Sequence, residues 1–361
     1  MPKSYIDTVG LTHIFSKIKK LVSDNAGGKR ASRLTVGTSA SGWTAKDCDY
    51  LCDGTEDHKE INNAINALPA TGGEVVILDG TYNITGAINL NKAGVTLRGN
   101  GVATKINRAF TGSSASPACV YLTGTDCVVR DISIEGNRET YTNASYGNGI
   151  RSTAERCTIA NCYVSNTYAN GIHVVADYNT IKGCHAVGNK EGIYVTGGHN
   201  VVNGNIAMTN DKGGITLNGN YNSATSNVCR FNEEGNIQMT AANHNVVIGN
   251  DCVVEAGDEI APTWTIRIRD YDSSYNICLN NIIGEGDIIN LGTENTIGTV
   301  RDLAKADLSN ASGTLGGQVV ANAAAVATLG TAQVRNTKIG TTDMTAGSSA
   351  LATGDSYHVY E

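Results

Sequence analysis

Isoleucines that follow a small residue recur at a nearly constant interval through the middle of the chain. They stand at Ile150, Ile172, Ile193, Ile215 and Ile237, with steps of 22, 21, 22 and 22 residues. A period in the low twenties is typical of a solenoid, in which each repeat buries its apolar face by stacking on its neighbours. Val, Ile, Thr, Asn and Gly dominate from about 145 to 290 and helix formers are sparse. Each repeat is therefore expected to form short strands joined by turns.

Asparagines form a second periodic set that runs in step with the isoleucines. Stacked coils would place equivalent amides about 4.8 Å apart, where they can hydrogen-bond along the stack. Asn also tolerates the left-handed backbone of a sharp turn. The asparagines mark the two ends of a six-residue segment that recurs in successive repeats. The segments begin at Asn179, Asn200, Asn222, Asn245 and Asn276 and end at Cys184, Asn205, Asn227, Asn250 and Asn281.

These two patterns predict an all-β fold, a parallel β-helix with about 22 residues per coil. Its handedness should be right-handed because parallel crossovers almost always are. We expect three parts: an N-terminal helix and arm at 1–41, the β-helix at 42–300, and a C-terminal stem or closing segment at 301–361. Apolar spacing predicts the N-terminal helix at 10–22.

A second helix, at about 55–68, should cap the first coil. Asp53 or Thr55 can begin it, and Ile61, Ala64, Ile65 and Leu68 give it one apolar face. A helix in this place would cover an edge that otherwise invites aggregation.

Candidate chemistry follows from the alternation of side chains along each strand. If the isoleucines point inward, the next residues point outward and stack on one another. That column contains Arg151, His173 and Tyr194, followed by Thr216 and Gln238. Continuing the alternation brings Glu155 and Asp177 to adjacent coils of the same face.

This constellation admits three interpretations. Glu155 and Asp177 could act as acid and nucleophile in glycoside hydrolysis. Tyr194 or His173 could instead serve as base and acid in a polysaccharide lyase, with Arg151 neutralising a uronate carboxylate. The third interpretation is structural or simple binding, because an exposed sheet face must be polar and opposite charges help to set register.

Two loops interrupt the period and are candidate binding elements. The first, at 136–149, carries Tyr146. The second lies between Asn245 and Asn276, where the spacing rises to 31 residues, and carries Trp264. Loops that leave a rigid scaffold often hold function. Trp264 is interpreted either as a sugar-stacking platform or as part of a contact between subunits.

Composition narrows the classes of partner. The net charge of −7 and the absence of a basic run argue against nucleic acid. No apolar stretch is long enough to insert in a membrane, and the N-terminus lacks the apolar core of a secretory signal, so we expect synthesis in the cytoplasm. The ten cysteines are interpreted mainly as small buried thiols. Cys48 and Cys52 give only a weak metal or disulfide signal. No metal site or cofactor is predicted.

Three segments resemble known families. DGTEDHKEINNAINALPATGGEVVILDGTYNI (53–84) resembles the opening coil of the pectate-lyase-like superfamily of right-handed β-helices, which contains lyases, hydrolases and non-catalytic spikes. The start, YIDTVGLTHIFSKIKKLVSD, and the end, from 332 to 361, are similar to tail proteins of phages and prophages of Gram-positive bacteria. The resemblance implies a spike-like tail protein of the virion, a homotrimer that contacts other tail proteins and the host surface.

Two function hypotheses follow. The first is a tail-spike-like protein that binds a bacterial surface polysaccharide. The second is an enzyme on the same scaffold, a glycoside hydrolase or lyase that degrades that polysaccharide. An enzyme needs an acid/base pair in a groove with a perturbed pKa, whereas a binding protein needs only polar and aromatic contacts.

Overall fold

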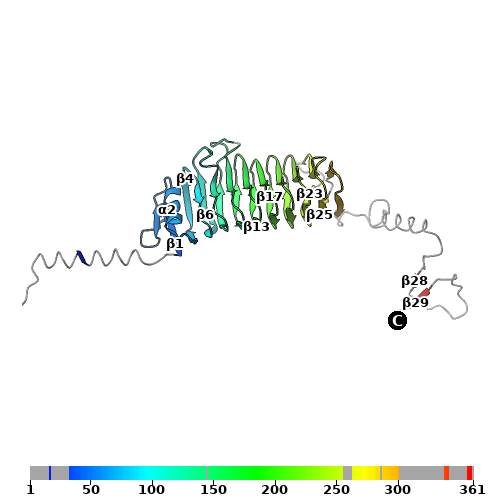
Figure 1. The fold of residues 1–361 in the computed structure, drawn as a ribbon, viewed down its shortest axis with the longest axis horizontal. Helices are drawn as coiled ribbons and strands as arrows, with labels where there is room; N and C mark the ends of the chain where they lie inside the picture. The colour runs from blue at the N-terminus through cyan, green and yellow to red at the C-terminus, as the bar shows by residue number, and fades with distance from the viewer. Residues whose placement is uncertain are drawn as a thin grey trace, which may run out of the picture. The chain divides into compact units, whose positions relative to one another are not determined.

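The computed structural model describes residues 16–17, 32–143, 145–254, 262–284, 287–300, 337–340 and 356–359. The chain divides into two compact units, Met1–Arg301 and Asp302–Glu361. From residue 32 on, the described residues of the first unit form a stack of β-strand coils (Figure 1). In the second unit, the described residues form one parallel strand pair, β28 (Thr337–Gly340) with β29 (Ser356–Val359).

The strands of the first unit form two sheets that run along the stack. The smaller sheet, sheet B, contains β5 (Ile88–Leu90), β7 (Ala118–Leu122), β9 (Asn148–Ser152), β12 (Asn170–Val174), β15 (Glu191–Val195), β18 (Gly213–Leu217), β21 (Gly235–Met239), β24 (Trp264–Ile268) and β26 (Ile288–Asn290).

The larger sheet, sheet A, carries the other strands of each coil. It contains β1 (Arg33–Thr38), β2 (Tyr50–Cys52), β3 (Gly73–Ile77), β4 (Gly80–Ile84), β6 (Val95–Arg108), β8 (Val128–Glu135), β10 (Thr158–Ala160), β11 (Tyr163–Ser165), β13 (Thr180–Lys182), β14 (His185–Val187), β16 (Val201–Asn203), β17 (Ile206–Met208), β19 (Ser223–Thr225), β20 (Val228–Arg230), β22 (Val246–Ile248), β23 (Asp251–Val254), β25 (Ile277–Gly284) and β27 (Thr296–Val300). Neighbouring coils pair in parallel in both sheets, which confirms the predicted all-β parallel β-helix.

The isoleucine column forms the spine of the core. Ile150, Ile172, Ile193, Ile215 and Ile237 are direct register partners on successive strands of sheet B. All five side chains are fully buried. Burial of each is worth about 1.5–3 kcal/mol, so the repeat period is a direct consequence of this shared apolar column.

The asparagine columns hold the coils together through the backbone. The side-chain oxygen of Asn227 accepts a hydrogen bond from the backbone N–H of Asn205 at 2.9 Å. The side-chain N–H of Asn227 donates to the carbonyl of Val202 at 3.0 Å. The bond from a backbone N–H to the next side-chain oxygen repeats along the column that opens on Asn179. It also occurs in a third column, which the sequence analysis did not identify: Asn189, Asn210 and Asn232.

The left-handed turn residues are the residues before these asparagines, and not the asparagines themselves. In the column that opens on Asn179, the residue before each Asn is aromatic, except for Glu294 before Asn295. The backbone φ of these residues lies between 54° and 60°. The Asn carboxamide is thereby freed to bond the neighbouring coil. The aromatic residues are Tyr178, His199, Tyr221, His244 and Tyr275.

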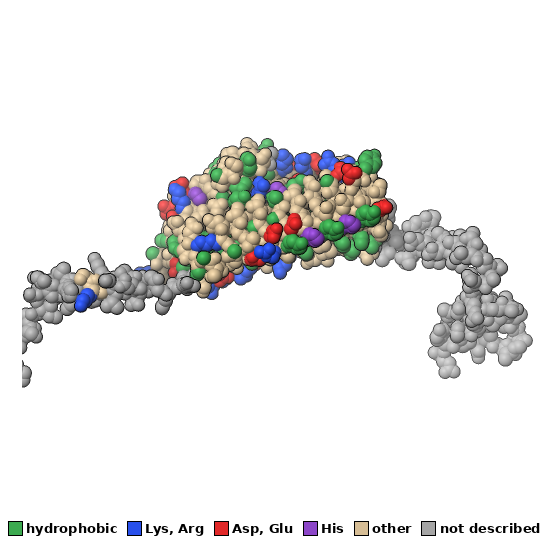
Figure 2. All heavy atoms as spheres, viewed as in Figure 1, with side chains coloured by type: hydrophobic (Ala, Val, Ile, Leu, Met, Phe, Trp, Pro, Cys, Tyr) green, Lys and Arg blue, Asp and Glu red, His purple; other side chains and the backbone are tan. Residues whose placement is uncertain are grey.

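These five aromatic residues stack on one another on the outside of the coils; we call them the aromatic ladder. Successive ring centroids are 4.9, 4.9, 4.8 and 5.0 Å apart, with interplanar angles of 12°, 5°, 1° and 6°. Figure 2 shows histidine and hydrophobic side chains alternating along this face. Since the inner rings cover each other's faces, the ladder presents ring edges to solvent.

The predicted capping helix forms as α2 (His58–Ala67). Ile61, Ala64, Ile65 and Leu68 are buried, as its apolar pattern indicated. The helix begins after Asp57, rather than after Asp53 or Thr55. The Asp57 carboxylate instead accepts backbone hydrogen bonds from Gly54 and Asn83, which tie the start of the helix to β4.

The first strand of sheet A lies inside the segment predicted to be an N-terminal arm. Leu34 and Val36 of β1 point inward and are buried, and β1 pairs with β2 and β3. Two apolar residues that alternate with polar ones are therefore enough to form a strand in this Gly/Ser/Thr-rich segment. Of the helix predicted at 10–22, residues 16–17 are described and are helical, and the rest lies outside the described residues. The segment at 301–336 also lies outside them.

All ten cysteines are free thiols. Every one except Cys48 is buried, so the interpretation as small core residues is confirmed for the other nine. Thiols fill the interior of narrow coils where a larger apolar side chain would not fit.

We predict that Asn227→Ala destabilises the protein by roughly 2–4 kcal/mol, because it leaves buried backbone groups without partners. Chemical unfolding followed by circular dichroism measures this change. Asn203→Ala is the control, since Asn203 is exposed. Equal effects of the two substitutions would show that the buried amide column does not hold the coils together.

We further predict that Tyr221→Ala costs about 1–3 kcal/mol, because two ring contacts are lost at once. Tyr271→Ala provides the control, because Tyr271 is 77% exposed and has no stacked ring partner among the described residues. The melting temperatures of the two variants measure the difference in stability. A Tyr221 variant as stable as the Tyr271 variant would contradict a stabilising role for the aromatic ladder.

Candidate functional site

The predicted outward column exists on sheet B. Arg151, His173, Tyr194, Thr216 and Gln238 are register partners on successive strands, and Arg267 continues the column. The His173 and Tyr194 rings lie 5.1 Å apart at an interplanar angle of 50°. Alternation along the strands is therefore sufficient to place this column.

His173 is held neutral by its surroundings. Burial, and to a smaller extent the charge of Arg151 on the preceding coil, together lower the pKa of His173 to about 4. Its Nε2 atom is buried and has no hydrogen-bond partner in the described part of the chain. An imidazole in this setting is a poor proton donor at neutral pH, which weakens its predicted role as the acid of a lyase.

Glu155 and Asp177 lie beyond the ends of these strands. β9 ends at Ser152 and β12 ends at Val174, so the alternation does not extend to either carboxylate. Glu155 forms an ion pair with the adjacent Arg156 at 3.2 Å. Asp177 accepts a hydrogen bond from the backbone N–H of Gly198 at 2.7 Å. Both carboxylates thus make local contacts in turns, away from the column that contains His173 and Tyr194.

The two loop candidates have different surroundings. Tyr146 is half-buried, and its backbone carbonyl accepts a hydrogen bond from the buried Arg108 at 3.4 Å. Trp264 begins β24 and is only 5% exposed. Its indole packs against the backbone of Gly235, where an added Cβ would lie 2.1 Å from the ring. Trp264 therefore forms a wall, and it does not project as an exposed platform.

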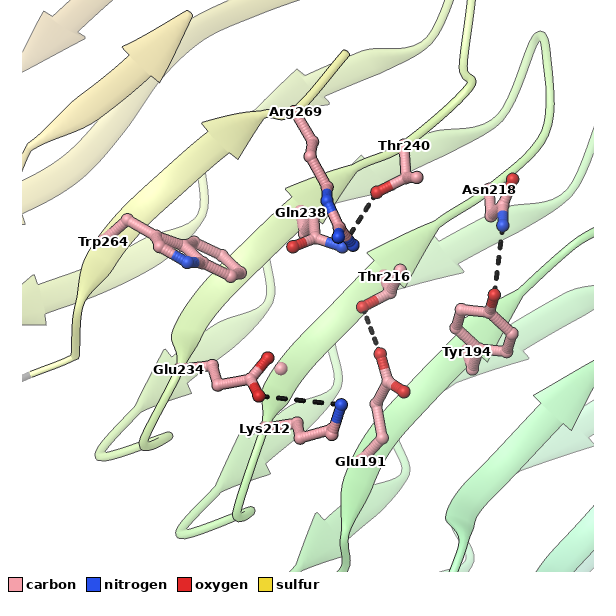
Figure 3. A pocket seen from close by; sticks show the side chains of 11 residues that line it. Glu191, Tyr194, Lys212, Thr216, Asn218, Glu234, Gln238, Thr240, Trp264 and Arg269 are labelled. Atoms are coloured by element: carbon pink, nitrogen blue, oxygen red, sulfur yellow. Dashed lines mark hydrogen bonds and ion pairs between the residues drawn. The ribbon is translucent and has the colours of Figure 1, made fainter. Parts of the chain in front are cut away.

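A pocket of about 230 Å³ lies on sheet B over β15, β18, β21 and β24 (Figure 3). It is hollow because Gly213, in one outward-facing column of sheet B, has no side chain to fill it. Gly213 and Gly235 are register partners, followed by Trp264 on β24, and the pairing of β15 with β18 places Glu191 before them. The pocket is lined by Glu191, Tyr194, Lys212, Gly213, Thr216, Asn218, Glu234, Gln238, Thr240, Trp264 and Arg269.

Two carboxylates of the pocket have contrasting environments. Glu191 accepts a 2.5 Å hydrogen bond from the Thr216 hydroxyl. Burial raises the pKa of Glu191 above its ordinary value, while the Thr216 hydrogen bond and the charge of Lys212 oppose that rise. Glu234 is 54% exposed and forms an ion pair with Lys212 at 3.6 Å. The pocket therefore combines a largely buried carboxyl group with a hydrated, paired one.

Neutral hydrogen-bonding groups complete the pocket. The Asn218 amide donates to the Tyr194 hydroxyl at 3.0 Å, and the Gln238 amide donates to the Thr240 hydroxyl at 2.8 Å. These contacts fix the orientation of side chains that face the hollow (Figure 3). Donors, acceptors and both signs of charge thus converge on one surface.

The structure brings together two of the predicted residues, Tyr194 and Trp264, in this pocket. Arg151, His173, Glu155, Asp177 and Tyr146 do not line it. Sequence reasoning missed Glu191, Lys212, Glu234 and Arg269. A signal for Glu191 existed two residues before the periodic isoleucine, where successive coils carry Glu191, Gly213, Gly235 and Trp264.

One group of potential metal ligands occurs among the described residues, at Cys52, Asp57 and Glu60, with ligand atoms within 4.8 Å of one another. Both oxygens of Asp57 already accept backbone hydrogen bonds. Burial raises the pKa of Cys52 well above that of an ordinary thiol, which disfavours the thiolate that binds metal. The group fits a structural role at the start of α2.

No helix in the described ranges has the length and apolar character required to cross a bilayer.

Comparison with known proteins supports the fold. Residues 75–228 match a family model described as a right handed beta helix region. The chain thus has the right-handed parallel β-helix fold, and the expected handedness is confirmed. No curated protein sequence matches the chain.

Solved structures with the same fold come from viruses and bacteria. ORF18 of Geobacillus virus E2 is 16% identical, with a TM-score of 0.53 over 83% of this chain and 66% of that one. The enzymatically active domain of tailspike protein 2 of bacteriophage CBA120 is 12% identical, with a TM-score of 0.56 over 70% of this chain and 41% of that one. An alginate lyase from Paenibacillus sp. str. FPU-7 is 12% identical, with a TM-score of 0.56 over 75% of this chain and 95% of that one.

The chain spans 66% of the length of the Geobacillus virus protein and 41% of that of the CBA120 domain. At these identities the likeness establishes the fold alone.

The burial of His173 predicts a pH dependence of stability. An unfolded histidine takes up its proton near pH 6.5, whereas folded His173 does so near pH 4. Between these values the unfolded chain binds more protons, so the folded state loses stability as the pH falls through this window. The His173→Gln variant lacks this titration. As the pH falls from 7 to 4, its free energy of unfolding should therefore decrease by up to about 3 kcal/mol less than that of the wild type.

Urea unfolding at a series of pH values from 7 to 4 measures this effect. Gln238→Ala, in the same column, is the control and should keep the wild-type slope. An unchanged slope in the His173 variant would contradict the neutral, buried state of this histidine.

Proposed function

We propose that this protein is a spike-like tail protein of a phage or prophage and that its sheet B pocket binds a polysaccharide of the bacterial surface. The observation that carries the proposal is the pocket itself, an open hollow along the stack in which hydroxyl, amide and charged groups converge. Sugars present dense hydroxyl groups that both donate and accept hydrogen bonds, and these side chains offer matching partners.

The chemistry of the pocket fits a polymer. The strands of sheet B are repeated along the stack, so the same outward positions recur at each coil and a long chain can lie across them. Trp264 closes one end of the hollow, and Glu191 lies at the other. Lys212 and Arg269 add positive charge, which suits a polysaccharide that carries acidic groups.

The tail-protein assignment rests on sequence resemblance at both termini and on the shared fold. The resemblance extends to Gram-positive hosts, to a homotrimer and to contacts with other tail proteins. It supports the proposal that the protein is part of the virion after synthesis in the host cytoplasm. In this proposal the part of residues 1–41 that precedes β1 attaches or packs, β1 and residues 42–300 form the β-helix that presents the binding face, and residues 301–361 form a stem or closing segment. The net charge of −7 argues against a nucleic-acid partner.

Gly213→Ala tests the pocket by filling it. The added Cβ would lie 2.9 Å from the Thr216 hydroxyl oxygen and 3.5 Å from a Glu191 carboxylate oxygen, with no backbone atom among its close contacts. The fold should therefore persist while the hollow shrinks. We expect at least a tenfold loss of affinity, about 1.4 kcal/mol, for the polysaccharide that the wild type binds.

The measurement is binding of the full chain to an array of Gram-positive surface polysaccharides and alginate, followed by calorimetry on the best ligand. Asn203→Ala, on sheet A, should bind as the wild type does. Unchanged binding by the Gly213 variant would exclude the pocket as the binding site. Binding of no polysaccharide by the wild type would contradict the proposed function.

A further inference from the structure

Two acidic side chains of the pocket differ in the way that acid and base catalysts differ. The Glu191 carboxyl group is largely buried and hydrogen-bonded by Thr216, and burial favours its protonated form. Glu234 is half-exposed and faces the ammonium group of Lys212. Two carboxyl groups in such different environments, one buried and one exposed, are suited to opposite roles in one reaction.

We propose that the pocket hydrolyses the polysaccharide it binds, with Glu191 as the general acid and Glu234 as the general base. The inference rests on the proposed binding function and adds an activity to the same site. It replaces the pair suggested by the sequence, Glu155 and Asp177, whose carboxylates make local contacts in turns.

The register of the strands sets the distance between the two groups. Glu234 immediately precedes Gly235, which lies two coils from Glu191, because Gly213 occupies the coil between them. Two strand spacings separate the backbones by about 9.5 Å. Lys212 lies on the intervening coil (Figure 3). Side chains that rise from the sheet in parallel keep a separation of this order. Carboxyl groups about 6.5–9.5 Å apart have room between them for a water molecule and a sugar ring, which is the arrangement of inverting glycosidases.

The reaction then follows from these positions. Glu191 donates its proton to the glycosidic oxygen as the bond from the anomeric carbon to that oxygen breaks. Glu234 accepts a proton from a water molecule whose oxygen attacks the anomeric carbon from the opposite face. The products are a new reducing end of inverted configuration and a free hydroxyl group, with solvent water as the only co-reactant. Proton transfer from water to Glu234 and from Glu191 to the leaving group balances the charges.

Neighbouring side chains position this pair. The Thr216 hydroxyl donates to one oxygen of Glu191, which leaves the other oxygen to carry the proton toward the substrate. The Lys212 ammonium orients Glu234. Trp264, packed on Gly235, gives the sugar ring a firm apolar wall beside Glu234.

The test uses the full chain and the polysaccharide identified on the array of Gram-positive surface polysaccharides and alginate. Release of reducing ends measures cleavage, and calorimetry measures binding. Glu191→Gln and Glu234→Gln should each lower the cleavage rate by at least about 100-fold while binding persists. The matched control is Glu155→Gln, because Glu155 is a carboxylate outside the pocket, and it should cleave at the wild-type rate.

The shape of the pH profile and the product configuration give further readouts. Wild-type activity should fall at high pH as Glu191 loses the proton that it must donate, and Glu191→Gln should remove this limb. Proton NMR during the first turnovers should show an inverted anomeric configuration.

The outcomes separate the two proposals. Binding of a polysaccharide by the wild type without any cleavage overturns the hydrolase inference and leaves the binding function in place. Full cleavage by either Gln variant, retention of configuration, or an unsaturated product typical of β-elimination also overturns it. A wild type that binds no polysaccharide contradicts the binding function from which the inference starts.

Discussion

The hydrogen bond between an asparagine side chain and the backbone of the preceding coil is the constraint on which the rest of the structure depends. A parallel β-helix gains its apolar core only if equivalent strand positions of successive coils stay in register. The buried carboxamides of the columns accept from a backbone N–H of the preceding coil, and many also donate to a carbonyl, as Asn227 does with Asn205 and Val202. A coil that slipped by one residue would bury unpaired amides and would turn its isoleucine outward, both at substantial cost.

Fixed register explains how a simple repeat can hold a specific site. Because equivalent positions lie above one another, the missing side chain at Gly213 opens a hollow without disturbing the coils, and Gly235 leaves room for the Trp264 indole. The flanking members of the same column, Glu191 and Trp264, become the ends of that hollow. The scaffold thus provides rigidity, and departures from the repeat provide the chemistry.

Much of the fold could be predicted from the sequence because the residues that form the core and hold the coils together recur at a regular spacing. The isoleucine column, two of the three asparagine columns and the apolar face of α2 lie where their spacing indicated. Strand β1 was missed because Leu34 and Val36 form too short an alternation to stand out from a Gly/Ser/Thr-rich segment. The aromatic ladder was missed because Tyr and His alternate, so neither residue repeats on every coil.

The candidate site was less predictable. Alternation placed Arg151, His173 and Tyr194 correctly on one column, but it was extended past the ends of β9 and β12 to Glu155 and Asp177. Strand length depends on where the backbone turns, which periodicity does not reveal. Glu191 and Glu234 come together with Trp264 across coils of unequal length, including one with a long insertion, so only the three-dimensional register unites them.

The most direct test of this account is a crystal structure of the protein with an oligosaccharide cut from the polysaccharide that it binds. We expect the sugar to lie on sheet B between Glu191 and Trp264, above Gly213. Sugar bound instead along the aromatic ladder or on sheet A, with the pocket empty, would contradict the central claim that this glycine-lined hollow is the functional site.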